Sequence, residues 1–250
     1  MGLDILEKIT DPYERKARLY PALITLLPIV ALIFTVYGGK LSAYYQVVTI
    51  AISFGGLFLL SNISREYGKR VENAMFKEWG GKPTTLLLRH KDQTIEKPTK
   101  LRYHQFLSTK ISVPFPDTGQ EATHLGNADD IYQSGVRWLL KETRDKEKFN
   151  LLFKENVTYG FRRNALGLKK MGIFICCACI IYILLLNKMI TADPHNFDLT
   201  QILQLSTPHI VSFSISVVFL LIWVLFFTKE SLHTAAFTYA EELLKACDSL

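Results

Sequence analysis

Four basic side chains in the middle of the chain have the residue types for chemistry on a phosphate group. Arg89 and His90 form one pair, and Arg102 and His104 form a second pair further along the sequence. Arginine binds phosphate oxygens through two parallel hydrogen bonds, and histidine exchanges a proton near neutral pH. An enzyme would need all four groups in one pocket. Because the spacing does not require this, we favour solvated or hydrogen-bonded histidines and predict no catalytic residue, no metal site and no cofactor.

The glycine pair before Lys82 resembles the end of a phosphate-binding loop, but the spacing excludes the Walker type. That pattern needs a glycine where Phe76 stands and a serine or threonine where Pro83 stands. We therefore interpret Gly80-Gly81 as a turn that ends a helix. A weaker anion site at Lys82 stays open.

A second basic group, with Tyr159, Arg162 and Arg163, precedes the third apolar segment of the chain. Aromatic rings at the membrane interface and arginines on lipid phosphates are typical of an anchor, which is the interpretation we favour. The alternative is a cytoplasmic partner or ligand that the two arginines bind.

Four segments that contain no Asp, Glu, Lys, Arg or His determine the fold class: Tyr20–Tyr37, Ala43–Ser61, Met171–Asn187 and Ile210–Thr228. Crossing the ~30 Å hydrocarbon core takes roughly 20 apolar residues, whereas a helix of a soluble protein is charged on one face. The sequence therefore predicts a mainly α protein with four transmembrane helices. The lack of ionisable residues inside these segments argues against a pump or a proton-coupled transporter.

Basic residues set the predicted orientation. The segment between the second and third spans carries nine Lys and Arg side chains near its two ends. The connections 38–42 and 188–209 together carry two. Segment 62–170 holds 21 of the 29 basic residues and 13 of the 23 acidic ones. Basic loops stay in the cytoplasm and attract anionic headgroups, so we place this segment and both termini there. A nucleic-acid partner is not favoured, because the bases do not form one run with interleaved aromatics.

The predicted organisation has five parts. An interfacial helix at 1–19 precedes transmembrane helices 1 and 2 at 20–61, and a mostly helical cytoplasmic domain follows at 62–170. Transmembrane helices 3 and 4 lie in 171–228 with an external loop at 188–209, and a cytoplasmic helix occupies 229–250.

Helices are expected to extend beyond the spans. The second span should continue through Ser64–Trp79, the third should be preceded by a helix from about Phe149, and the fourth should continue through Glu230–Ala246. Between them we expect a helix at Thr99–Lys110, a loop at 111–127 and a helix that starts at Asn127.

Small residues recur at helical spacing within the spans, where they allow helices to approach closely in lipid. Packing within one chain is the interpretation we favour, with self-association or a hydroxyl-lined pore as alternatives. The residues are Thr49, Ser53, Gly56, Gly172, Cys176, Cys179, Ser212 and Ser216.

Three stretches of the middle segment resemble signatures of a group of uncharacterised bacterial four-span inner-membrane proteins. They are Trp79-Gly80-Gly81-Lys82-Pro83-Thr84-Thr85 with Leu88-Arg89-His90, then Arg102-Tyr103-His104, then Tyr159-Gly160-Phe161-Arg162-Arg163-Asn164. The resemblance implies a bacterial inner-membrane location and assigns no catalytic role.

The leading hypothesis is a non-enzymatic, homo-oligomeric membrane scaffold or effector whose cytoplasmic domain receives a signal or a protein partner. Its architecture is similar to that of membrane effectors of anti-phage defence, by analogy only. A channel with a cytoplasmic gate is the first alternative. A membrane-bound enzyme that uses Arg89, His90, Arg102 and His104 on a phosphate-bearing substrate is the second.

Overall fold

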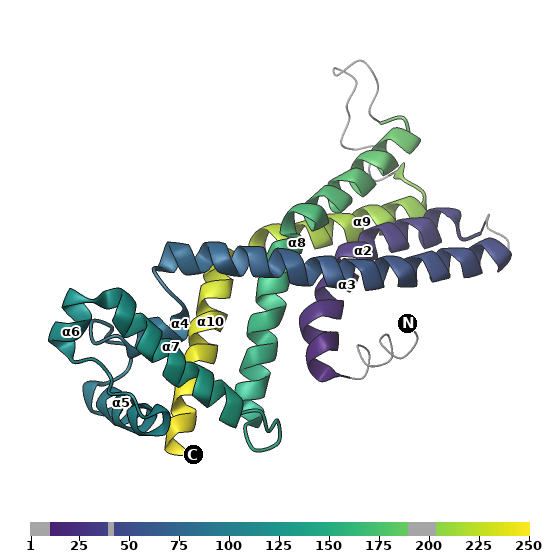
Figure 1. Cartoon of the computed structure of the whole chain (residues 1–250). Helices are drawn as coiled ribbons and strands as arrows, with labels where there is room; N and C mark the ends of the chain where they lie inside the picture. Colours follow the sequence, from purple (N-terminus) through teal and green to yellow (C-terminus); the bar gives the residue numbers. More distant parts are fainter. Residues whose placement is uncertain (1–10, 40–42, 190–203) are drawn as a thin grey trace. The chain divides into compact units, whose positions relative to one another are not determined.

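A computed structural model describes residues 11–39, 43–189 and 204–250, with the backbone alone at 43–49 and 51–54 (Figure 1). Within these residues the regular structure is helical and no strand occurs, which confirms the predicted fold class at this level. The predicted interfacial helix at 1–19 falls largely outside the described residues. Its last residues, Glu14–Leu19, form a π-helical turn (η1) that runs directly into α2, Tyr20–Leu32.

Three helices are long and apolar enough to cross a membrane, by length and composition, among the described residues. The first, Glu14–Tyr37, consists of η1, α2 and the π-helical turn η2, Ile33–Tyr37. The second is α8, Asn150–Leu186. The third, Thr207–Phe226, consists of α9, Thr207–Leu221, and the π-helical turn η5, Ile222–Phe226. Helices of this length and composition are typical of a membrane protein.

The remaining predicted span, 43–61, forms the beginning of α3, Ala43–Trp79. Most of its side chains lie outside the described residues, so this span stays a prediction. The extension of the second span through Trp79 is confirmed, because α3 is one continuous helix. The helix expected from about Phe149 into the third span is likewise confirmed by α8.

The chain divides into two compact units. The first, here called the apolar unit, contains 1–71 and 160–231, and the second, here called the polar unit, contains 72–159 and 232–250. Each unit has a hydrophobic core of its own. The structure therefore groups the C-terminal helix with the middle segment of the chain, whereas we treated the two as separate parts.

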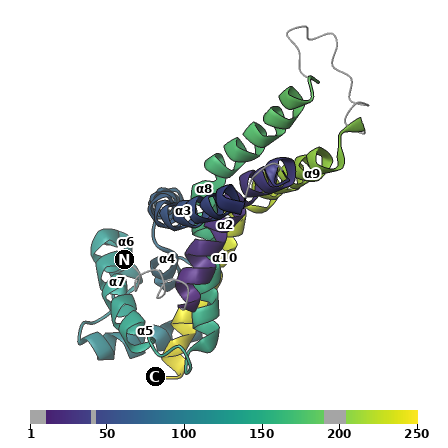
Figure 2. The same ribbon diagram turned by 90° about the vertical axis from the view of Figure 1, so that its right-hand side faces the viewer.

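In the apolar unit, α2 lies beside α9 (Figures 1 and 2). Inside the unit the side chains are closely packed: Trp223 is fully buried and contacts α8 at Gly172, where a β-carbon would collide with the indole ring. Large apolar side chains point outward instead, including Phe174 at 71% and Leu225 at 70% exposed. Exposed apolar surface of this kind is unfavourable in water and favourable in lipid.

Two glycines bring the backbones of α3 and α8 into direct contact. A β-carbon added at Gly167 would lie 2.6 Å from the backbone nitrogen of Gly68 and 2.7 Å from the carbonyl carbon of Tyr67. Real β-carbons do not approach backbone atoms so closely, so only glycine fits at this crossing.

The stretch from Gly160 to Asn164 attaches α8 to the first apolar helix. A β-carbon at Gly160 would lie 3.1 Å from the β-carbon of Ala17. Fully buried Asn164 donates from Nδ2 to the backbone oxygen of Ala17 over 2.8 Å and accepts from Nε of Arg163 over 3.2 Å. This part of the Tyr159–Asn164 stretch is therefore used in packing.

The helix of the fourth predicted span does not continue into the C-terminal tail, so that expectation is wrong. At Phe227 the backbone leaves the helical region, with φ −91° and ψ 85°. The next helix, α10, begins at Lys229 and ends at Lys245. Lys169 of α8 stabilises the break, because its Nζ donates to the backbone oxygens of Val224 over 3.1 Å and Phe227 over 2.9 Å. These carbonyl groups lack helical partners at such an end.

The polar unit consists of short helices around a leucine-rich core, with α7 lying against α4, α5 and α6 (Figure 1). The fully buried leucines come from α4, α5, α7 and α10. The elements are the end of α3, α4 (Pro83–Leu88), α5 (Lys97–Ile111), α6 (Thr118–Thr123), α7 (Leu125–Glu142), the start of α8, most of α10, and a 3-10 turn, η6 (Ala246–Asp248).

The helix expected at Thr99–Lys110 corresponds to α5, whereas the loop expected at 111–127 contains α6 and the start of α7. Asp117 begins α6 with a capping box: its carboxylate accepts from the backbone of Gln120, whose side chain accepts from the backbone of Asp117. α7 begins at Leu125, so Asn127 is not the helix start that we expected.

The units differ in charge. The polar unit contains fifteen basic and fifteen acidic residues, so it is formally neutral, and the whole excess of +6 belongs to the apolar unit. Most of the basic surplus that we assigned to segment 62–170 therefore lies at its two ends, next to the apolar segments. This is where anionic headgroups would attract it.

Candidate functional site

Arg89 connects the turn after α3 with α7. α3 ends in a Schellman motif: Gly80 (φ +82°) and Gly81 (φ +157°) have backbone conformations that favour glycine, and Gly81 donates to the backbone oxygen of Phe76 over 2.8 Å. The Arg89 guanidinium donates to both carboxylate oxygens of Asp129, over 2.9 and 2.6 Å, and to the backbone oxygen of Gly80 over 3.0 Å. The hydrogen bond to Asp129 raises the pKa of Arg89.

Next to it, buried Glu121 connects the turn after α4 to α7. Its two oxygens accept from the backbone N–H of His90, over 3.1 and 2.9 Å, and Oε2 also accepts from the hydroxyl of Tyr132 over 2.6 Å. Burial and the hydrogen bond to Glu121 raise the pKa of Tyr132, which stays a neutral donor. The His90 ring donates to the backbone oxygen of Pro116 over 2.9 Å.

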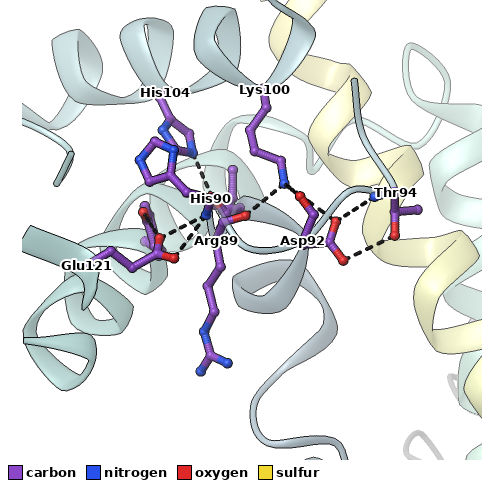
Figure 3. A network of polar contacts seen from close by, with 9 residues as sticks. Arg89, His90, Asp92, Thr94, Lys100, His104 and Glu121 are labelled. Carbon is purple, nitrogen blue, oxygen red and sulfur yellow. Dashed lines mark hydrogen bonds and ion pairs between the residues drawn. The ribbon is translucent and has the colours of Figure 1, made fainter. Parts of the chain in front are cut away.

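Two side chains of α5 reach the same turn, as Figure 3 shows. His104 donates from Nε2 to the backbone oxygen of Leu88 over 2.8 Å, and its ring meets that of His90 edge to face at 5.0 Å. Lys100 donates to the backbone oxygens of Arg89 over 2.8 Å and Asp92 over 2.6 Å. We call this set, Arg89, His90, Asp92, Lys100, His104 and Glu121, the turn network.

The turn network stabilises the fold by hydrogen bonds to the backbone. Arg89, His90 and His104 lie together, as the enzyme hypothesis requires, but their donors are directed at backbone oxygens and at Asp129. Arg102 lies elsewhere on α5, 58% exposed, and its Nε donates to Asp248 over 2.9 Å. The four groups therefore do not converge around a space for a substrate.

Burial of His104 makes the polar unit sensitive to acid. Desolvation lowers the pKa of His104 from 6.5 to about 4. Since the folded state holds the neutral ring, its stabilisation is present above pH 6.5 and is lost as the pH falls through 4. A shift of this size corresponds to about 3 kcal/mol. We expect His104→Gln, which keeps a donor, to flatten the fall of the thermal midpoint between pH 6.5 and 4. If the thermal midpoint fell equally with pH in the unchanged protein and in His104→Gln, His104 would not be the source of the acid sensitivity.

Lys82 and Tyr159, predicted from separate motifs, line one cavity of the polar unit, of about 200 Å³. Lys82 is exposed and donates from Nζ to Oε1 of Gln133 over 2.8 Å. Buried Tyr159 donates from its hydroxyl to Glu72, and its ring is parallel to that of Tyr239 at 5.8 Å. We call this space the α7 cavity, because α7 supplies one wall of it.

Arg162 and Arg163 belong to the apolar unit. The Arg162 guanidinium lies 4.1 Å from the centroid of the Phe226 ring, a cation–π contact, and Arg163 is buried beside Asn164. Their expected contact with lipid phosphates stays a prediction.

Several small residues of the spans lie in the interior of the apolar unit. Cys176, Ser212 and Ser216 are fully buried, Cys179 is 3% exposed and hydrogen-bonds Ser216, Gly172 contacts Trp223, and Gly56 faces Leu26. These positions are used within the chain, so they leave little surface for self-association or for a pore. The side chains of Thr49 and Ser53 lie outside the described residues.

Sequence reasoning missed the partners that give these residues their contacts. Glu121, Tyr132, Lys100 and Asp129 were not among the predicted site residues. For α7 a local signal existed: Asp129, Gln133 and Arg137 are spaced four residues apart, so they share one face of the helix. No such signal indicated Glu121 or Lys100, which come from other helices.

No group of three or more His, Cys, Asp or Glu side chains that could hold a metal occurs in the described part of the chain. Comparison with protein-family models, with curated proteins and with solved structures finds no match, so the resemblance to bacterial four-span proteins stays a prediction.

Proposed function

We propose that this chain is a non-enzymatic protein of the bacterial inner membrane, in which four spans anchor a cytoplasmic polar unit that receives a signal or partner. One observation carries the proposal: the chain forms two units with separate cores, and α3 and α8 each run through both as uninterrupted helices. A change in the polar unit that moved either helix would reach the spans directly.

The contacts of the turn network do not favour an enzymatic role for Arg89, His90 and His104. Its cationic groups are engaged by backbone oxygens and carboxylates, an arrangement that stabilises a fold. The lack of ionisable residues in the four apolar segments is expected for an anchor and not for a transport pathway. Self-association stays part of the proposal, although it would need a surface other than the small residues already buried.

The placement of charge supports the proposed orientation. The surplus of basic residues belongs to the apolar unit, and much of it follows the second span or precedes the third, at Arg65, Lys69, Arg70, Lys169 and Lys170. By the positive-inside rule these positions stay in the cytoplasm, and the polar unit, which follows α3 and precedes α8, stays with them.

Cysteine labelling tests this orientation. After the four native cysteines are replaced by alanine, single cysteines are placed at exposed positions, Gln120→Cys in the polar unit and Gly39→Cys after the first span. A membrane-impermeant maleimide should label Gly39→Cys in intact spheroplasts and Gln120→Cys only after lysis. Labelling of Gln120→Cys in intact cells would overturn the proposal, as would recovery of the chain in the soluble fraction.

The receiving role needs a separate measurement. The protein is purified in a mild detergent and the mass of the particle is determined. Separately, the entry of a membrane-impermeant dye is measured in cells that overexpress the chain. Assembly into a larger particle, or a membrane defect that depends on an intact polar unit, supports the role. A strict monomer without either effect contradicts it.

A further inference from the structure

We propose that the α7 cavity is a binding site for a small amphipathic anion, with an aromatic or short aliphatic body and a phosphate or carboxylate head. This inference rests on the proposed function in one respect, because it identifies the receiving site of the polar unit. It requires no catalytic step.

The walls of the cavity are suited to an apolar body. Phe76, Tyr159 and Tyr239 contribute rings, and Val136 and Leu243 contribute aliphatic surface. The two tyrosine rings are held in place by their stacking and by the hydrogen bond from Tyr159 to Glu72, so the aromatic wall is preformed. Pockets for small molecules have this composition, with mostly apolar walls and a few polar groups that orient the ligand.

Two cations lie where the head of such a ligand would be. Lys82 and Arg137 are both exposed lining residues, and the hydrogen bond shown for Lys82 is to the neutral amide of Gln133. Among the described residues no ion pair with a carboxylate is found for either. Glu72, the carboxylate of the lining, is engaged by the Tyr159 hydroxyl. The cavity therefore combines two cations for an anionic head with one acid that already has a donor.

The fold positions these cations before any ligand binds. Arg89 holds both Gly80 and Asp129, and Lys82 follows the Gly80-Gly81 turn directly. Asp129, Gln133 and Arg137 are four residues apart on α7, so the helix that anchors the turn also presents the second cation. A preorganised site loses less entropy on binding.

The volume sets the size of the ligand. A cavity of about 150 Å³ accommodates a benzene molecule, so the α7 cavity, at about 200 Å³, has room for one ring and part of a polar head. The exposed cations allow the remainder of the head to reach solvent. A ligand of this size would contact α3, α8 and α10 together, and thus two of the helices that continue into the apolar unit.

The test uses the full chain in nanodiscs of zwitterionic phosphatidylcholine, with phenyl phosphate as the probe. Its affinity is measured by titration calorimetry beside that of benzyl alcohol and of inorganic phosphate. We expect phenyl phosphate to bind at least about tenfold more tightly than either, since the ring and the head each contribute. Lys82→Gln and Arg137→Gln should each weaken phenyl phosphate by about tenfold and leave benzyl alcohol unchanged.

Lys141→Gln is the matched control, because Lys141 is an exposed cation of α7 outside the cavity lining. It should bind phenyl phosphate like the unchanged protein. Nanodiscs that contain phosphatidylglycerol separate the two sources of such an anion: competition with the probe identifies a lipid headgroup, and its absence identifies a soluble ligand.

The proposal is overturned if phenyl phosphate fails to bind, if benzyl alcohol binds equally well, or if both charge variants keep full affinity. The labelling experiment is independent of these results. Correct orientation without phenyl phosphate binding would remove this site and leave the proposed function standing.

Discussion

Replacing Gly167 by alanine should prevent the apolar unit from packing, although alanine is the better helix former. The added β-carbon would meet the backbone of Gly68 and Tyr67 at 2.6 and 2.7 Å, and backbone atoms of a helix cannot move aside singly. The helices α3 and α8 would have to separate along their contact. We expect a loss on the order of 4 kcal/mol, seen as a lower thermal midpoint or as aggregated protein in detergent.

Gly55→Ala is the matched control in α3. A β-carbon at Gly55 would meet no atom of the described residues within 4 Å, so the helix should gain up to about 1 kcal/mol from its higher propensity. The two substitutions are chemically identical and should have opposite signs. If Gly167→Ala left the midpoint as high as Gly55→Ala does, the close approach of α3 and α8 would be wrong.

Replacing Glu121 by alanine should destabilise the polar unit by about 3 kcal/mol. The carboxylate is 6% exposed and accepts from the His90 backbone and from the hydroxyl of fully buried Tyr132. Its removal would leave two buried donors without acceptors, and each costs about 1–3 kcal/mol. Unfolding monitored by near-ultraviolet circular dichroism, to which Tyr132 contributes, should show a midpoint lower by roughly 10 °C.

Glu121→Gln separates charge from hydrogen bonding at this position. The amide oxygen can accept from His90 while the amide nitrogen donates to the Tyr132 oxygen, so we expect less than half of the alanine effect. Asp130→Asn, at an exposed position of α7, should be neutral. A neutral result for Glu121→Ala would show that Glu121 does not support the turn after α4.

The helical frame of this protein follows from sequence patterns that depend on local chemistry. Long charge-free runs predict the spans, and the run of helix formers after the second span predicts the extension of α3 to Trp79. The stop at Gly80-Gly81 was also predictable, because a glycine pair is a strong signal for the end of a helix. In the structure both glycines have the positive φ angles that favour this residue. Each of these signals lies within a few residues of the structure that it specifies.

The features that were missed depend on residues far apart in the sequence. The break at Phe227 lies in a continuous apolar run, and it is stabilised by Lys169, which precedes it by 58 residues. α6 is short, and its capping box, Asp117 with Gln120, lies among prolines and glycines that favour a loop. Propensity alone could not predict either one.

In the candidate site, too, the sequence indicated single residues but not the contacts between distant ones. Lys82 and Tyr159 were chosen for their residue types, and the fold brings both to the α7 cavity. Arg137 and Tyr239 were not chosen, because an arginine on an amphipathic helix and a tyrosine in the C-terminal helix are common. Their association depends on the docking of α10, which no local pattern specifies.

The position of α10 in the chain has a consequence for biosynthesis. α10 supplies Leu243 and Leu244 to the core of the polar unit, but it is translated after the 72 residues of 160–231 that separate the two segments of that unit. At about 5–20 residues per second, the middle segment waits roughly 4–15 seconds on the ribosome with its leucines uncovered. Its native state is therefore reached only after the last apolar helix has been synthesised, and chaperones have this interval in which to bind the unfinished core.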